Sequence, residues 1–277
     1  MTETTRKVCV VTGSSSGIGA ATARLYAGNG WNVVVNFSRD PAPAEAVAEE
    51  CRALGAEVLV IKADISDDAD CRRMADEVQK TWGRADVLVN NAGTTKFVAL
   101  KNLDGLDAQD FQDIYSVNVI GAYQMTRAFA PMLEKQEGAG VVNISSIASM
   151  MGRGSCIAYM ASKGALNAMT AGLARALGPA IRVNAIAPGF IESPWLRKGL
   201  HEYRDLVGGY FPGRRRRSRL VAWCWCSQDD RRSLVARCGS ASGLGCPCSL
   251  VVSMSANSGI VRQKSVRGQR ETILIWR

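Results

Sequence analysis

The sequence predicts an α/β fold in which helices cover both faces of a parallel sheet. Three observations predict it. Short runs of Val, Ile and Leu recur along the first two thirds of the chain, segments with a helical period separate them, and most of the runs are continuously apolar. Continuous apolar runs are typical of strands buried on both faces of a parallel sheet. Strands that alternate with helices in this way form a doubly wound sheet with right-handed crossovers.

Six strands and the helices between them are predicted in order. The strands are expected over Lys7–Val11, Asn32–Phe37, Glu57–Ala63, Asp86–Asn90, Gly140–Ser145 and Ile181–Ala187. A helix pattern follows the first strand, and apolar residues at helical spacing predict further helices over residues 44–54 and 71–82. Longer helices are expected over residues 107–135 and 159–177. The alternation stops near Pro212.

Length and composition agree with a globular chain of this class. It has 277 residues, of which 47% are apolar or aromatic, so it can bury a core without disulfides or metals. No apolar run reaches the roughly 18 residues of a membrane span. Residues 1–7 are polar, unlike a secretory signal. We therefore expect a cytoplasmic protein without a membrane partner.

A glycine-rich turn separates the first predicted strand from the first predicted helix. Its glycines allow the backbone to approach a pyrophosphate, and the helix N-terminus presents free N–H groups and a positive dipole end to it. Because the turn occupies the first strand–helix junction of an α/β chain, it predicts a Rossmann-type dinucleotide site. The candidate cofactor residues in this turn are Gly13, Ser15, Ser16, Gly17, Ile18 and Gly19.

Polar residues also follow the third and fourth predicted strands. Asp64 either accepts a hydrogen bond from an adenine amino group or caps the next helix. The segment Asn90–Gly93 either borders a ligand crevice at the carboxyl ends of the strands or forms an ordinary Asx turn. We assign five of these residues to the candidate cofactor site: Asp64, Ile65, Asn91, Ala92 and Gly93.

The pattern Tyr159-Met160-Ala161-Ser162-Lys163 indicates acid–base chemistry. A Tyr and a Lys four residues apart share one helix face. A lysine ammonium beside a phenol favours the phenolate, so we expect the pKa of Tyr159 to lie below its reference of about 10. Ser146, at the end of a predicted strand, is placed to donate a hydrogen bond to a substrate carbonyl. Asn118 lies inside a long predicted helix, where an amide has modest helix propensity.

These motifs, followed by the Pro188-Gly189 pair, occur in one order along the chain. With them, residues 5 to about 195 resemble the short-chain dehydrogenases/reductases. Within that family the chain is similar to 3-oxoacyl-(acyl-carrier-protein) reductases and glucose dehydrogenases. The resemblance implies the strand order 3-2-1-4-5-6 and a homo-oligomer, either a dimer or a tetramer. It also implies that Pro188, Gly189 and Ile191 contact the cofactor.

The resemblance further implies a role for each catalytic residue. Tyr159 protonates the carbonyl oxygen during reduction, while Lys163 depresses its pKa and holds the nicotinamide ribose, so both also touch the cofactor. Ser146 orients and polarises the carbonyl of a small-molecule substrate. Asn118 shapes its helix and supports a water linked to Lys163. The hydride that converts the carbonyl to a secondary alcohol comes from the nicotinamide cofactor.

The end of the second predicted strand bears on the choice of cofactor. An NAD site usually carries an acidic residue there, whereas Asn36, Phe37 and Ser38 are uncharged and Arg39 follows them. Arg39 is suited to bind a 2′-phosphate. Against this, many NADP-using relatives carry a basic residue where Ser16 stands, and Asp40 offers Arg39 an alternative partner. We predict NADP(H), with NAD(H) as the alternative.

Substrate identity is expected to depend on the loop 147–158 and on a lid over residues 190–212. Their large apolar and aromatic residues either line the substrate pocket or pack the lid onto the body: Met150, Met151, Trp195, Tyr203 and Tyr210. His201 is the only histidine and is expected on the surface of the lid, so neither a Ser-His-Asp hydrolase nor a histidine-based metal site is predicted. No metal is predicted.

The tail differs from the rest of the chain. From Gly213 onward there are 13 Lys and Arg against 3 Asp and Glu, whereas the first 212 residues hold 21 against 22. We therefore predict one domain over residues 1–212 and an atypical basic, cysteine-rich tail over 213–277. This tail stands in place of the last helix and seventh strand that are usual in the family.

Three explanations of the tail are considered. We favour a shifted reading frame near Pro212, because the tail is rich in Arg, Ser, Cys, Trp and Gly and has no period. A nucleic-acid-binding extension is the second, but solvated basic loops are much commoner, so nucleic acid is not an expected partner. A zinc knuckle is the third, and its cysteine pairs have one intervening residue where such sites favour two to four. The alternatives to a reductase are a non-catalytic dinucleotide-binding or nucleic-acid-associated protein, and a product that the tail has left inactive.

Overall fold

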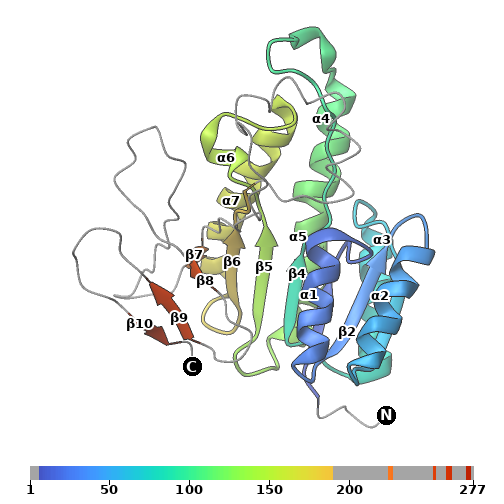
Figure 1. The fold of residues 1–277 in the computed structure, drawn as a ribbon. Helices are drawn as coiled ribbons and strands as arrows, with labels where there is room; N and C mark the ends of the chain where they lie inside the picture. Colours follow the sequence, from blue (N-terminus) through green and yellow to red (C-terminus); the bar gives the residue numbers. More distant parts are fainter. Residues whose placement is uncertain (1–5, 190–223, 227–251, 254–259, 264–272, 276–277) are drawn as a thin grey trace.

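The computed structural model describes residues 6–189 and the short strand segments 224–226, 252–253, 260–263 and 273–275. A sheet of seven strands forms the centre of the molecule (Figure 1). In this part of the chain, no helix combines the length and apolar character that a membrane crossing needs.

Six parallel strands of the sheet confirm the predicted fold class and strand order. Their order is β3-β2-β1-β4-β5-β6. Each predicted strand is present, with its ends within one residue of the expected bounds. The observed strands are β1 (Val8–Val11), β2 (Asn32–Phe37), β3 (Val58–Lys62), β4 (Val87–Asn90), β5 (Gly140–Ile144) and β6 (Arg182–Ile186).

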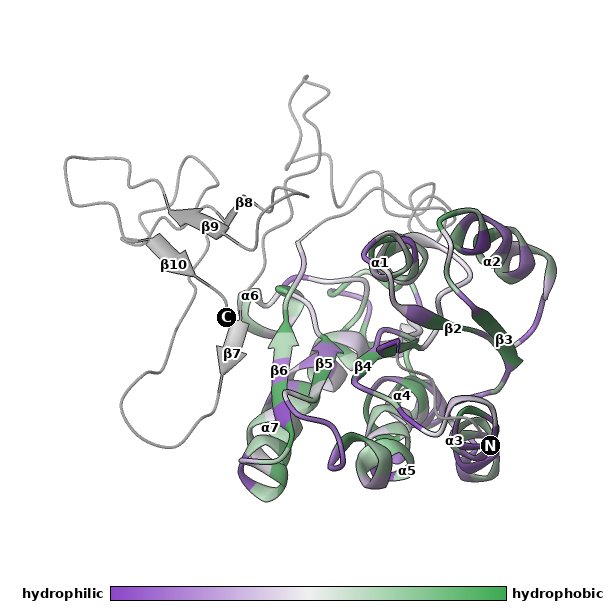
Figure 2. Ribbon diagram, turned by 90° about the horizontal axis from the view of Figure 1, so that it is seen from below, coloured by the Kyte–Doolittle hydropathy of each residue, from purple (hydrophilic) through white to green (hydrophobic). Residues whose placement is uncertain are grey.

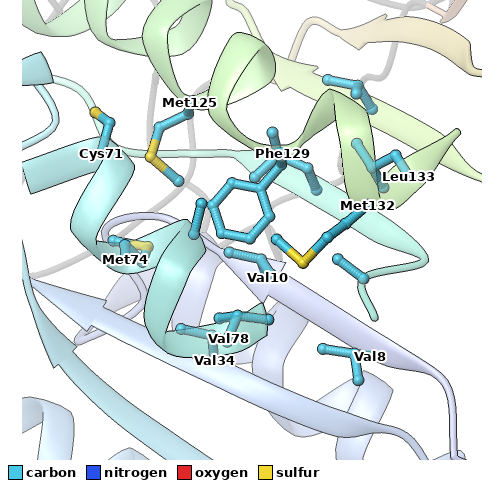
Figure 3. Packing of buried hydrophobic residues seen from close by; sticks show 14 of the residues in the cluster. Val8, Val10, Val34, Cys71, Met74, Val78, Met125, Phe129, Met132 and Leu133 are labelled. Atoms are coloured by element: carbon cyan, nitrogen blue, oxygen red, sulfur yellow. The ribbon is translucent and has the colours of Figure 1, made fainter. Parts of the chain in front are cut away.

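Helices cover both faces of this sheet, as Figure 2 shows. On one face, α1 (Gly17–Gly28) and α2 (Ala42–Ala53) pack small side chains against β2. On the other, α3 (Asp68–Trp82), α5 (Ala122–Leu133) and α7 (Ile157–Leu177) enclose the largest cluster of buried residues. Phe129 lies in the middle of that cluster, between the methionines of α3 and α5 and the valines of the sheet (Figure 3). Both faces of the sheet are therefore covered by helices, as the continuously apolar strands predicted.

The long helix predicted over residues 107–135 is interrupted. It consists of α4 (Ala108–Tyr115), a π-helical turn η2 (Ser116–Gly121) and α5. The wider turn lets Gly121 lie directly against Ile65, where a Cβ would come within 2.8 Å of the Ile65 carbonyl oxygen. Such π-helical turns are frequent at functional sites. Two further short helices, η1 (Leu103–Gly105) and α6 (Ala148–Met151), lie in the loops that follow β4 and β5.

The tail contributes strands that the sequence analysis did not identify. β7 (Cys224–Cys226) pairs antiparallel with β6, so that Ala185 lies opposite Trp225. Residues 184–186 of β6 thus gain backbone partners at what would otherwise be an open edge. A separate antiparallel sheet has the order β10-β9-β8, with β8 at Val252–Ser253, β9 at Ile260–Gln263 and β10 at Ile273–Ile275. These strands are two to four residues long, which is too short to show a period in the sequence.

Candidate active site

A cleft of about 1250 Å³ lies at the carboxyl ends of the parallel strands. In open α/β sheets this is where ligands bind. Most of the predicted site residues line it: Gly13, Ser15, Ser16, Gly17, Ile18, Arg39, Asp64, Ile65, Asn91, Ala92, Gly93, Ser146, Tyr159, Lys163, Pro188 and Gly189. Gly19 and Asn118 lie behind its wall, and Ile191 falls outside the described residues, as does the predicted lid.

The glycine-rich turn after β1 is shaped by close backbone contacts. Gly13 has a φ of +59°, and a Cβ there would come within 2.8 Å of the Ala92 Cα. Gly19 faces the same turn from α1, and a Cβ on it would lie 2.6 Å from the Gly13 carbonyl oxygen. Ser16 precedes α1 and makes no side-chain cap, which leaves the N–H groups of the first helical turn to a ligand.

Asn91 connects this turn to β4. Its Nδ2 donates to the carbonyl oxygens of Thr12 (2.9 Å) and Gly13 (3.0 Å). The backbone N–H groups of Asn91 and Ala92 donate to the Thr12 hydroxyl at 2.9 and 3.0 Å. The segment is therefore more than a local Asx turn, because its hydrogen bonds hold two walls of the cleft together.

Asn36 is a positioning residue that the sequence analysis did not assign to the site. Its Oδ1 accepts from the Gly13 N–H (2.9 Å), and its Nδ2 donates to the carbonyl oxygens of Ile61 (3.2 Å) and Ala63 (3.0 Å). This buried amide joins the glycine-rich turn to the end of β3. The only signal in the sequence is an Asn among the apolar residues of β2.

Arg39 and Asp40 lie at the end of the cleft beyond β2. Asp40 accepts from the Ala42 backbone N–H (3.0 Å) at the start of α2. Among the ion pairs between described residues, none joins Asp40 to Arg39. Arg39 and Asp40 therefore do not form the ion pair that the sequence left open as an alternative.

Asp64 does not cap a helix, so that alternative is wrong. Its Oδ1 accepts from the Ser66 N–H (3.0 Å) and hydroxyl (2.7 Å), while Asp67 caps α3 through the Ala69 N–H (2.9 Å). The Asp64 side chain is exposed at the cleft, and the neighbouring Ile65 is buried against η2.

Tyr159 and Lys163 lie one turn apart on α7, as the sequence predicted, and both face the cleft. The Lys163 ammonium donates to the Ile144 carbonyl oxygen (2.7 Å) and lies 5.7 Å from the centroid of the Tyr159 ring. Cys156 caps the helix, with its Sγ accepting from the Tyr159 N–H at 3.4 Å.

The pKa of Tyr159 differs from the expectation. Burial raises it to about 12, and a hydrogen bond with the Ser146 side chain opposes that rise only in part. Burial lowers the pKa of Lys163 to about 8. The predicted lowering of the tyrosine pKa by lysine is thus wrong for this structure, since desolvation raises the pKa and the ammonium is bound to a backbone carbonyl, 5.7 Å from the ring centroid.

Ser146, rather than Ser145, faces the phenol. The Ser146 side chain is hydrogen-bonded to Tyr159, and its Oγ also accepts from the Ala148 N–H (3.1 Å). The Ser145 hydroxyl is buried and turned toward the Lys163 backbone carbonyl (3.3 Å). Both serines line the cleft, but Ser146, the serine assigned to the site from the sequence, is the one that contacts the phenol.

The family is identified by comparison with known proteins. A family model described as short chain dehydrogenase matches residues 7–203. The chain belongs to the short-chain dehydrogenase family. This is a family of oxidoreductases, and the predicted resemblance is confirmed.

Relatives of this short-chain dehydrogenase cover most of its described residues. A Streptomyces violaceoruber protein, provisionally named ketoacyl reductase 2 of the granaticin polyketide synthase, is 44% identical over 68% of this chain and 74% of its own. A 3-oxoacyl-(acyl-carrier-protein) reductase of Synechocystis is 35% identical over 70% of this chain and 77% of its own. A crystal structure from Burkholderia xenovorans, provisionally named a short-chain dehydrogenase/reductase, is 46% identical with a TM-score of 0.68, covering 70% of this chain and 81% of that one.

Proposed function

We propose that this short-chain dehydrogenase is an NADP(H)-dependent reductase that converts a 3-oxoacyl group to the corresponding secondary alcohol. The observation that carries the proposal is the contact between the Tyr159 phenol and the Ser146 side chain beside Lys163, in a cleft of about 1250 Å³ that the glycine-rich turn also lines. The named ketoacyl and 3-oxoacyl reductases among the relatives support this substrate class.

The cleft fits a nicotinamide dinucleotide. The glycine-rich turn and the uncapped start of α1 suit a pyrophosphate, because backbone N–H groups and a positive dipole end meet there. At Gly93 a Cβ would come within 3.2 Å of Asn118 Oδ1 and 3.6 Å of Lys163 Nζ, so the missing side chain leaves room beside the lysine. When bound, the cofactor supplies the hydride that reduces the carbonyl carbon.

The residues at the end of the cleft have complementary roles in the proposed reaction. The Ser146 hydroxyl donates a hydrogen bond to the carbonyl oxygen of the substrate and holds it near the phenol. Tyr159 transfers its phenolic proton to that oxygen as negative charge develops there. Lys163 stabilises the phenolate that remains, since a cation favours the charged form of a neighbouring acid.

Tyr159 is in the protonated form that reduction needs, although the raised pKa makes the phenol a weaker proton donor. A phenol with a pKa of about 12 is fully protonated near neutral pH, which is the form that a proton donor needs. The reverse oxidation requires the phenolate as a base, and burial disfavours that form. We therefore propose reduction as the direction that the residues of this chain favour.

Arg39 carries the proposed preference for NADP(H). Its side chain is exposed where β2 ends at the cleft, and Asp40 is engaged with the start of α2 instead. A guanidinium in that position can form two hydrogen bonds to a 2′-phosphate. We further propose that the protein acts as a dimer or tetramer, as the resemblance implies.

The decisive experiment compares the full-length protein with Tyr159→Phe. NADPH oxidation is followed with ethyl acetoacetate as a small 3-oxo ester, and NADPH binding is measured by fluorescence titration. We expect the variant to lose at least a hundredfold in kcat, as removal of a general acid does, while its affinity for NADPH stays within a few-fold of the parent. Wild-type protein that binds NADPH but reduces no 3-oxo ester or thioester would support a non-catalytic dinucleotide-binding protein instead.

A further inference from the structure

Ser162 lies between Tyr159 and Lys163 on α7 and has no assigned role. Its side chain is fully buried, and it does not line the cleft, so it touches neither substrate nor cofactor. Its hydroxyl has a single proton, which it donates to the Tyr159 backbone carbonyl (2.8 Å). Towards any other partner the hydroxyl can therefore act only as an acceptor.

That other partner is Asn118 on the π-helical turn η2. Asn118 Nδ2 donates to Ser162 Oγ (3.0 Å) and to the Thr94 carbonyl oxygen (3.0 Å), which uses both of its protons. Its Oδ1 accepts from the Thr94 N–H (2.8 Å) and keeps one lone pair free. The backbone groups of Thr94 and the Ser162 hydroxyl thus together fix which side of the amide faces α7.

The orientation of the Asn118 amide determines which of its atoms borders the space beside Lys163. Asn118 Oδ1 and Lys163 Nζ lie within 3.2 and 3.6 Å of the point that a Gly93 Cβ would occupy. The oxygen of the amide, and not its NH₂ group, therefore borders the same small space as the ammonium. We propose that Ser162 is a positioning residue that acts through Asn118, holding the amide oxygen toward Lys163.

Asn118 lies in the π-helical turn η2. Hydrogen bonding in π-helical turns departs from the regular α-helical pattern, so the position of Asn118 depends on the bonds that its side chain makes. Of these, only the bond to Ser162 connects η2 to the helix that carries Tyr159 and Lys163.

Thr170 provides a matched control on the same helix. It is also buried, donates to a carbonyl oxygen of its own helix (Leu166, 2.7 Å) and accepts from an Asn amide (Asn143 Nδ2, 2.9 Å). It lies two turns further along α7 and does not line the cleft. Thr170→Val therefore removes the same kind of bond without affecting Asn118.

The experiment rests on the proposed function and uses the full-length protein with NADPH and ethyl acetoacetate. We expect Ser162→Ala to lower kcat about tenfold, as misplacement of a supporting group does, with KM for NADPH changed less than twofold. The double variant Ser162→Ala/Asn118→Ala should be no slower than Asn118→Ala alone. Thr170→Val should lose a similar amount of thermal stability but keep kcat. Unchanged kcat in Ser162→Ala, or losses that multiply in the double variant, would overturn the inference.

Two further measurements keep the inference testable. Ser162→Cys retains the volume but is a poor acceptor, so it replaces the alanine variant if that variant does not fold. If the wild type reduces no ester, the proposed function fails, and ¹⁵N-lysine NMR then decides the inference by following the titration of Lys163. The Tyr159 ring of α7, the Ile144 carbonyl of β5 and the Asn118 amide of η2 face this ammonium. Displacement of the amide oxygen from Lys163 should lower the pKa of Lys163 in Ser162→Ala but not in Thr170→Val, and equal titration in all three proteins would overturn the inference.

Discussion

Lys163 should destabilise the folded protein at neutral pH when no ligand is bound. Burial lowers its pKa from 10.5 to about 8. Lowering a pKa by one corresponds to about 1.4 kcal/mol, so keeping the lysine charged costs the folded state roughly 3 kcal/mol below pH 8. Lys163→Met keeps the aliphatic volume but leaves the Ile144 carbonyl without its hydrogen bond, at a cost of about 1 kcal/mol. We therefore expect the variant to be about 2 kcal/mol more stable than the wild type at pH 7.

The sign of this difference should depend on pH. Between pH 8 and 10.5 the unfolded wild type keeps the lysine proton and the folded wild type does not, so its stability rises with pH relative to the variant. Near pH 10.5 the wild type should become the more stable protein by about the value of the lost hydrogen bond.

Urea unfolding at pH 7 and at pH 10.5, followed by tryptophan fluorescence at one protein concentration, measures both differences. The exposed Lys96→Met serves as the control, because its ion pair with Asp110 raises the pKa of Lys96 and its removal should not stabilise the protein. A Lys163→Met protein that is less stable at pH 7, or a difference that does not change with pH, would refute the reasoning.

Three other substitutions test the cofactor site and the core of the fold. Arg39→Glu should weaken NADPH binding at least tenfold and leave NADH binding nearly unchanged, because it places a carboxylate where the 2′-phosphate is expected. Parallel fluorescence titrations measure both affinities, and equal losses for the two cofactors would contradict the prediction. Gly19→Ala should reduce the affinity for both dinucleotides by a similar factor, since its Cβ would lie 2.6 Å from the Gly13 carbonyl oxygen and distort the turn. A folded variant whose affinities are unchanged in the same titrations would contradict the prediction. Asp86→Ala should lower the free energy of unfolding by about 3 kcal/mol, because the nearly buried carboxylate binds the Arg84 guanidinium and the first N–H of β1. Urea unfolding measures this loss. A loss below about 1 kcal/mol would show that the ion pair contributes little.

The sheet could be predicted from the sequence because most of its strands are apolar runs, and the central ones are buried on both faces. In the register that the structure shows, Val10 lies between Val34 and Leu88 on neighbouring strands, and all three are fully buried. The order of the site motifs along the chain then placed Ser146 and Tyr159 at the same edge of the sheet. The assignment of Ser146 and Tyr159 to one site also used the resemblance to the short-chain dehydrogenases/reductases.

The remaining features depend on contacts that no local pattern shows. The π-helical turn keeps the apolar spacing of a long helix, so residues 107–135 show no interruption in the sequence. Asn36 shows no local signal of its role in β2, because its partners are the carbonyl groups at the end of β3 and an N–H of the turn after β1, which are distant in the sequence. For Tyr159 the local pattern shows the lysine but not the burial that outweighs it, so it predicts the wrong direction for the pKa.

The burial of Tyr159 and Lys163 connects catalysis to stability. It keeps the phenol protonated for proton donation, and it also makes the buried ammonium costly to the folded protein. A dinucleotide that binds only the folded protein adds about 2.7 kcal/mol of stability at a hundredfold excess over its dissociation constant. That gain is close to the roughly 3 kcal/mol that the charged lysine costs. The protein should therefore reach its full stability only with the cofactor bound, so the residue that weakens the empty protein is the one that the proposed reaction requires.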